Sequence, residues 1–113
     1  MNTVEVLEKA KERLRGHWCQ GAYSMTDDGV ECPIETPGCR VCAHGAVIHA
    51  TDSMEVRYGV QWSALSFLGS AAISNGFDSA PMYNDAEGRT EEEVLALFDK
   101  AIELAKAEEV SAK

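Results

Sequence analysis

The stretch TEEEVLALFDKAIELAKAEE, residues 90–109, decides the fold class of this chain. Thr90 and Glu93 have the spacing of a helix capping box, and the three glutamates of the first turn suit the positive end of a helix dipole. Apolar residues then recur at helical spacing, and they are Val94, Leu97, Phe98, Ala101, Ile102 and Ala105. The pattern predicts an amphipathic helix over residues 90–108, whose apolar face other elements must cover.

Three further helices are expected, near residues 3–15, 40–51 and 60–74. The first has Asn2 as its cap and Gly16 as its end. The second has a slim face made of Cys42, Gly45, Ala46 and His49. The third is expected to pack through Trp62, Leu65, Leu68 and Ala72 and to end at Asn75-Gly76.

Two segments carry strand signals. Residues 22–32, AYSMTDDGVEC, predict a hairpin that turns at Asp28-Gly29, with Tyr23 and Val30 on either side. Residues 54–62, MEVRYGVQW, alternate as a strand does before the helical pattern takes over. We therefore expect a mainly α protein, in which about four helices pack around one core with a small β-hairpin between the first two helices. Residues 1–113 are expected to form a single domain.

The charge of the chain restricts its partners. Its 113 residues include 19 acidic and 10 basic side chains, which give a formal net charge of −9. Nucleic acid and anionic membrane surfaces repel such a chain, whereas a basic protein suits it. The first residues lack an apolar signal core, and no run approaches the roughly 20 apolar residues of a membrane span. We expect a cytoplasmic protein with no membrane or nucleic-acid partner.

Four cysteines, Cys19, Cys32, Cys39 and Cys42, lie within 24 positions. Together they are an alternative zinc-ligand set, but they contain one C-x2-C pair where a typical zinc motif has two close pairs. We therefore expect free thiols and no cofactor, with a zinc-stabilised domain as the alternative.

Catalytic signatures are weak. Cys42 near the start of a helix suggests a thiol nucleophile, to which Gln20, a histidine and Asn84 would be partners, yet no spacing supports the set. The phosphate-binding patterns GxxxxGK[ST] and GxGxxG do not occur. The composition and motifs favour a protein that is not an enzyme.

The segment PMYNDAEGRT, residues 81–90, has two interpretations. Asn84 and Asp85 are turn formers and Arg89 precedes the cap, so the segment can simply lead into the last helix. The same three polar side chains can instead present a cluster for a ligand or partner.

Three ordered motifs resemble a family of small uncharacterised proteins from bacteriophages and bacteria. The matching stretches are Trp18 to Ala22, Cys42 to Ala46, and Asn84 through Ile102, while Tyr83 stands where the family often has tryptophan. The resemblance covers most of the chain and implies a single-domain protein of phage or bacterial origin. It also implies a location in the cytoplasm of the bacterial host cell. It implies no reaction.

The resemblance groups polar residues at the ends of elements, and we expect these candidate site residues to converge at one end of the helical bundle: Trp18, Gln20, Cys42, Asn84, Asp85 and Arg89. The group is expected to be a polar clamp, in which a buried Arg89 bonds Asp85 and either Gln20 or a backbone carbonyl, or else an open cleft. The favoured function is a non-enzymatic, phage-type accessory protein that binds a basic host protein through an acidic surface. A small-molecule or thiol-dependent site lined by these residues is the alternative.

Overall fold

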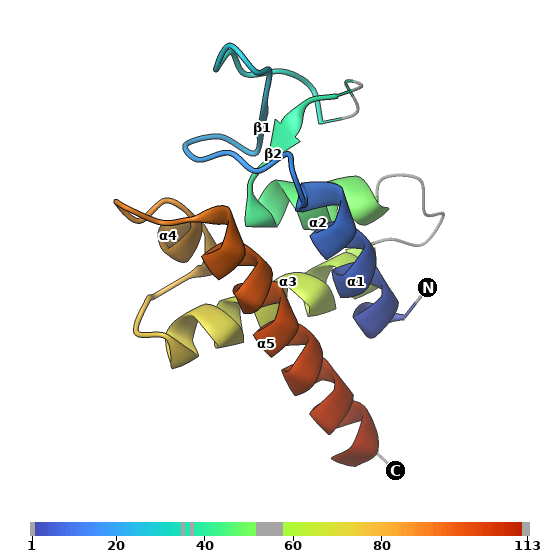
Figure 1. Cartoon of the computed structure of the whole chain (residues 1–113). Helices are drawn as coiled ribbons and strands as arrows, with labels where there is room; N and C mark the ends of the chain where they lie inside the picture. The colour runs from blue at the N-terminus through green and yellow to red at the C-terminus, as the bar shows by residue number, and fades with distance from the viewer. Residues whose placement is uncertain (1, 35, 37, 52–57, 112–113) are drawn as a thin grey trace.

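The computed structural model describes residues 2–34, 36, 38–51 and 58–111, and its order of elements is α1, β1, β2, α2, α3, α4, α5. The described residues contain five helices and a small two-stranded antiparallel sheet between the first two helices. The sheet lies at one end of the molecule, and the C-terminal end of α5 lies at the other (Figure 1). The predicted mainly α fold with a hairpin in this position is confirmed.

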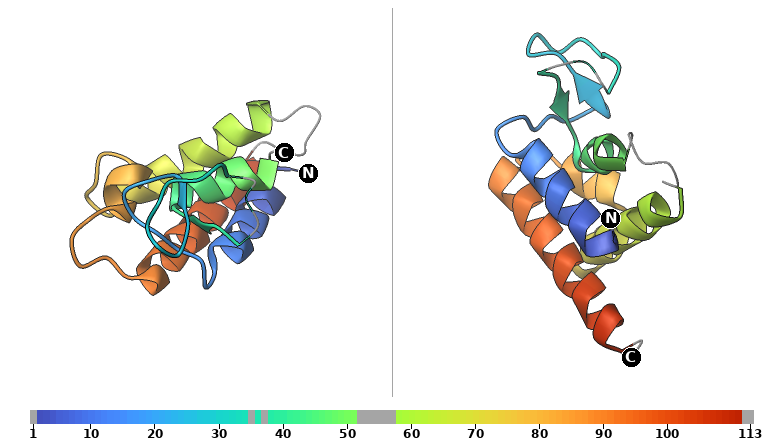
Figure 2. Two further views of the ribbon diagram at one scale, coloured as in Figure 1. Left: turned by 90° about the horizontal axis from the view of Figure 1, so that it is seen from above. Right: turned by 90° about the vertical axis from the view of Figure 1, so that its right-hand side faces the viewer.

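Four helices surround the core: α1 (Thr3–Leu14), α2 (Ala43–Thr51), α3 (Tyr58–Ser74) and α5 (Glu91–Ser111). The right-hand view of Figure 2 shows α1 and α5 lying side by side, and α3 packs against both. Apolar residues that the periodicity placed on one face of each helix are buried, among them Leu7, Leu68, Leu97 and Phe98. The helices therefore cover one another's apolar stripes, as amphipathic helices of marginal individual stability must.

The helix ends follow local chemistry. Asn2 and Glu5 form the capping box that begins α1. Thr90 and Glu93 form the equivalent pair before α5, where the Thr90 N–H donates to the Glu93 carboxylate at 2.9 Å. Gly76 follows α3 with a φ of 86°, a conformation that glycine adopts at little cost.

The strand pairing differs from the prediction. β1 (Ser24–Met25) pairs with β2 (Arg40–Val41), so that Ser24 lies opposite Val41, whereas Val30 belongs to neither strand. The chain does reverse around Gly29, where the Thr26 N–H bonds the Val30 carbonyl at 2.8 Å. The reversal is thus a tight turn on the edge of a sheet whose second strand comes from later in the chain.

The small sheet leads directly into α2 (Ala43–Thr51), which begins three residues later than expected because Arg40 and Val41 are in β2. On the predicted slim face of α2, the structure requires a glycine at position 45. A Cβ atom there would overlap the Tyr23 carbonyl oxygen of the segment before β1. Close contact with the hairpin, rather than with another helix, is what requires a glycine at this position.

Two helix predictions need correction. Trp62 was expected in the core but is 75% exposed, and the buried face of α3 runs through Ala64, Leu68, Ala71 and Ala72. The predicted strand at residues 54–62 is wrong from Tyr58 onward, since those residues begin α3, and Met54 and Val56 lie outside the described residues.

The short helix α4 (Ala80–Asn84) is an element that the sequence analysis missed. Ser79 caps it by accepting a bond from the Met82 N–H, and Pro81 occupies its first turn. Within the described parts of the chain, no helix combines the length and the apolar character needed to cross a membrane.

Candidate functional site

Asn84, the last residue of α4, is the centre of the motif cluster. Its side chain is fully buried and binds three segments. Its Oδ1 accepts the Trp18 indole N–H at 2.9 Å and the Ala43 backbone N–H at 3.0 Å, and its Nδ2 donates to the Cys19 carbonyl at 3.1 Å. These bonds join the segment after α1, the first turn of α2 and the end of α4.

Gln20 and Asp85 extend the same network at its exposed edge. The Gln20 side-chain amide donates to the Asn84 carbonyl at 2.9 Å and to the Ala86 carbonyl at 3.0 Å. Asp85 Oδ1 accepts the Gly21 backbone N–H at 3.0 Å and the Asn84 side-chain amide at 2.9 Å. Gln20, Asn84 and Asp85 thus each bond a backbone group of the opposite segment.

Cys42 is the residue before α2 and acts as its cap, because its Sγ accepts the Gly45 backbone N–H at 3.3 Å. Burial raises the pKa of this thiol, and hydrogen bonds from backbone N–H groups oppose the rise only in part. The next residue, Ala43, bonds Asn84. Cys42 therefore joins the cluster through the backbone that it positions, and its environment disfavours a reactive thiolate.

Arg89 lies beside the network but does not bond Asp85 or Gln20. Its Nε donates to the Tyr83 carbonyl at 2.8 Å, its Nη1 pairs with Glu93 at 3.1 Å, and its guanidinium lies 3.7 Å from the centre of the Tyr83 ring. The expected bond to a backbone carbonyl is present and the expected partner Asp85 is wrong. Arg89 secures the loop between α4 and α5, while Asn84 secures the hairpin.

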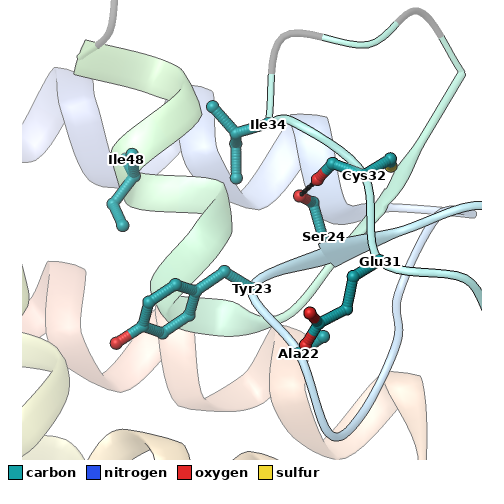
Figure 3. A pocket seen from close by; sticks show the side chains of 7 residues that line it. All are labelled: Ala22, Tyr23, Ser24, Glu31, Cys32, Ile34 and Ile48. Carbon is teal, nitrogen blue, oxygen red and sulfur yellow. Dashed lines mark hydrogen bonds between the residues drawn. The ribbon is translucent and has the colours of Figure 1, made fainter.

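Two adjoining pockets lie next to this clamp. One, of about 390 Å³, is lined by Ala22, Tyr23, Ser24, Glu31, Cys32, Ile34 and Ile48. Figure 3 shows the Tyr23 ring lying along α2, with Ile34 and Ile48 across from it and Glu31 on the opposite side of β1. The other, of about 250 Å³, is lined by Gly21, Ala22, Tyr23, Glu31, Cys42, Pro81, Asn84 and Asp85. The pockets share Ala22, Tyr23 and Glu31.

Two carboxylates give these pockets their charge. Glu31 lines both pockets and Asp85 lines the second, and no lysine or arginine is among the described residues that line either one. Tyr23 is 55% exposed, and its ring stacks on that of His44 at 4.9 Å between centroids. The site therefore combines negative charge with an aromatic surface, which suits a cation.

The cysteines contribute little reactivity. Burial raises the pKa of the Cys19 thiol to about 12, and the nearby Cys42 and Asp85 side chains add to the rise. Burial and the neighbouring Cys32 also raise the pKa of the Cys39 thiol. All four cysteines are described and carry free thiols, and in the part of the chain that the structure covers no three His, Cys, Asp or Glu side chains are grouped as metal ligands. The alternative ligand set of Cys19, Cys32, Cys39 and Cys42 is not assembled.

A comparison with known protein families gives one match. A family model of proteins of unknown function, DUF6197, matches residues 1–104. The chain belongs to DUF6197. Comparisons with curated proteins and with solved structures found no match.

In this DUF6197 chain, the convergence of the motif residues was predicted, whereas the Asn84-centred network and the pockets were not. Trp18, Gln20, Asn84 and Asp85 converge as expected. Tyr23 and Glu31 were not among the predicted site residues, because a pocket between a turn and a helix has no periodic signal. A sequence feature that pointed toward a pocket was Tyr23, a large aromatic residue next to a chain reversal.

Proposed function

We propose that this DUF6197 protein is a non-enzymatic accessory protein that binds a basic segment of another protein at the two adjoining pockets. The observation that carries the proposal is the pair of carboxylates, Glu31 and Asp85, in the wall of one pocket with an exposed tyrosine beside them. Its motifs support a phage-encoded setting, in which the partner is a protein of the bacterial host and the complex forms in the cytoplasm.

The charges around the pockets support a basic partner. Asp28 in the turn and Glu87 after α4 are exposed and flank Glu31 and Asp85 in sequence. Arg40 in β2 is paired with Asp27 at 2.9 Å, so the nearby cation is already balanced. A net charge of −9 attracts a basic segment over a distance of about 10 Å at 0.1 M salt, and the pockets provide a place for its side chains.

The site chemistry favours binding over reaction. A cysteine nucleophile needs a lowered pKa and a base within hydrogen-bond reach, whereas burial raises the pKa of Cys42, and the nearby His44 ring is stacked on Tyr23. The polar side chains of the clamp are occupied by backbone groups, as expected for a scaffold that holds a binding surface.

An oligoarginine peptide tests the proposal by isothermal titration calorimetry. We expect binding that weakens as salt rises from low to physiological strength, since screening reduces attraction between exposed charges. Glu31→Gln should weaken binding by about tenfold, the equivalent of about 1.4 kcal/mol. Glu31 is the position to change, because Asp85 also bonds the Gly21 backbone.

Glu108→Gln is the matched control, because it removes the same charge from an exposed site near the C-terminal end of α5. It should leave the affinity nearly unchanged. Equal weakening by both variants would show that only the net charge of the protein drives binding, not the pockets. Binding that depends neither on salt nor on Glu31 would contradict the proposed site.

A further inference from the structure

The two adjoining pockets differ in the chemistry of their walls. In the larger one, Ile34 and Ile48 provide aliphatic surface beside the Tyr23 ring, and both isoleucines are half-buried, so part of each side chain faces solvent. The smaller one contains neither isoleucine and is lined by two carboxylates, those of Glu31 and Asp85. We call the larger one the apolar pocket and the smaller one the acidic pocket.

The polar groups of the apolar pocket are already used or lie away from the isoleucines. Ser24 is buried, and its hydroxyl donates to the Cys32 carbonyl (Figure 3). Glu31 lies on the opposite side of β1 from Ile34 and Ile48 (Figure 3). A cationic head group placed against the isoleucines would therefore lose water without gaining a partner. An aliphatic side chain would bury apolar surface there at no such cost.

The carboxylates of the acidic pocket are available to a cation. No ion pair among the described residues involves Glu31 or Asp85. Asp85 uses Oδ1 to accept from Gly21 and Asn84, and no described residue donates to its Oδ2. A lysine or arginine side chain brings the N–H donors that these oxygens can accept, in hydrogen bonds that charge strengthens.

We propose that the segment bound by this site carries a basic residue and a large aliphatic residue two positions apart, which occupy the acidic and the apolar pocket respectively. The inference rests on the proposed function and specifies its partner. Ala22 and Tyr23 line both pockets, so the two occupants are neighbours. In an extended peptide, residues two positions apart project to the same side at a spacing of about 7 Å, whereas adjacent residues project to opposite sides.

Peptides of equal charge test this pairing by isothermal titration calorimetry. Three repeats of Arg-Gly-Leu-Gly should bind roughly tenfold more tightly than three repeats of Arg-Gly-Ser-Gly, because only the first peptide buries a leucine in the apolar pocket. Three repeats of Arg-Leu-Gly-Gly have the composition of the first peptide, but each leucine is an odd number of positions from every arginine. This third peptide should bind like the serine peptide.

Ile48→Ser assigns the gain to the apolar pocket. It should remove the advantage of the first peptide and leave the affinity for the serine peptide unchanged. Ile73→Ser makes the same change at an exposed isoleucine of α3, away from the pockets, and should keep the advantage. Because each variant is compared on two peptides, a loss of stability alone would not change the ratio of the two affinities.

The outcomes separate this inference from the proposed function. If the serine peptide binds and Glu31→Gln weakens that binding, but the first peptide binds wild type no more tightly, the proposed function stands and the inference is overturned. An advantage that survives Ile48→Ser, or that the third peptide shares, would also overturn the inference. If no peptide binds, or Glu31→Gln weakens none of them, both fail.

Discussion

The indole N–H of Trp18 donates to the side-chain oxygen of Asn84 at 2.9 Å, across 66 positions of sequence. The same oxygen accepts the first backbone N–H of α2, and the amide nitrogen of Asn84 returns a bond to the Cys19 carbonyl. One buried amide thus bonds three groups from two separate segments, two of them in fully buried bonds. An arrangement of this kind defines how the hairpin sits on the helices, since each unmade bond would cost about 1 to 3 kcal/mol.

Gly45→Ala should destabilise the protein by about 1 to 3 kcal/mol. The added methyl group would overlap the Tyr23 carbonyl oxygen, so the hairpin would have to move away from α2. Urea denaturation measures the loss. Gly59→Ala is the control, because its methyl group enters open space and the stability should stay the same or rise slightly. Equal effects of the two variants would refute the close contact.

Arg89→Ala should cost about 2 kcal/mol of unfolding free energy. Most of the loss comes from the Tyr83 carbonyl, which loses its donor, and from the ring beneath the guanidinium. The pair with Glu93 contributes less, since that carboxylate is largely exposed. Lys100→Ala breaks an exposed pair with Glu103 and should change little. A normal melting temperature for Arg89→Ala would contradict the structural role.

Asn84 and Arg89 show what could and what could not be predicted from the sequence. The convergence of Asn84 with Trp18 and Gln20 could be predicted because the family resemblance grouped these residues at the ends of elements. The partner of Arg89 was not, since choosing between Asp85 and Glu93 depends on the angle at which a short loop enters α5. Helix periodicity predicted α5 and most of α1.

The errors have a common physical cause. In α3 the residues on every side are apolar or small, so periodicity could not tell which face is buried, and Trp62 was placed inside. The strand partner of β1 was missed because a two-residue ladder carries almost no local signal. The pockets also depend on tertiary contacts and therefore could not be predicted from local sequence patterns.

Lowering the pH should weaken the start of α5. The pKa of Glu93 lies below its ordinary value of 4.5, chiefly because the Thr90 backbone N–H donates to the carboxylate. A depressed pKa contributes stability above the unfolded value, and that stability is lost as the pH falls through the folded one. Urea midpoints from about pH 6 to about pH 2 should therefore fall less for Glu93→Gln than for wild type.

Glu92→Gln provides the comparison for this pH series. It removes an acid from the same exposed turn without touching the Thr90 cap. Its pH dependence should follow that of wild type. A Glu93→Gln profile indistinguishable from both would show that the cap adds no pH-dependent stability.

Alkylation with iodoacetamide at neutral pH should modify Cys32 first and Cys19 very slowly. Cys32 is half-buried in a pocket wall, whereas Cys19 is buried with a pKa raised from 9.0 to about 12. That shift lowers the thiolate fraction about a thousandfold relative to an ordinary thiol. Peptide mass spectrometry reads the order. Release of one zinc ion per chain during the reaction would contradict the prediction that the thiols are free.

The central claim is that the motif cluster is a buried clamp, and Asn84→Ala tests it most directly. Equilibrium urea denaturation should show a loss of roughly 3 to 5 kcal/mol, because the indole N–H, the α2 N–H and the Cys19 carbonyl all lose their partner. Asn75→Ala, at the end of α3, removes one bond to a local carbonyl and should cost under about 1 kcal/mol. If Asn84→Ala is no more destabilising than Asn75→Ala, the clamp does not hold the fold together and the account is wrong.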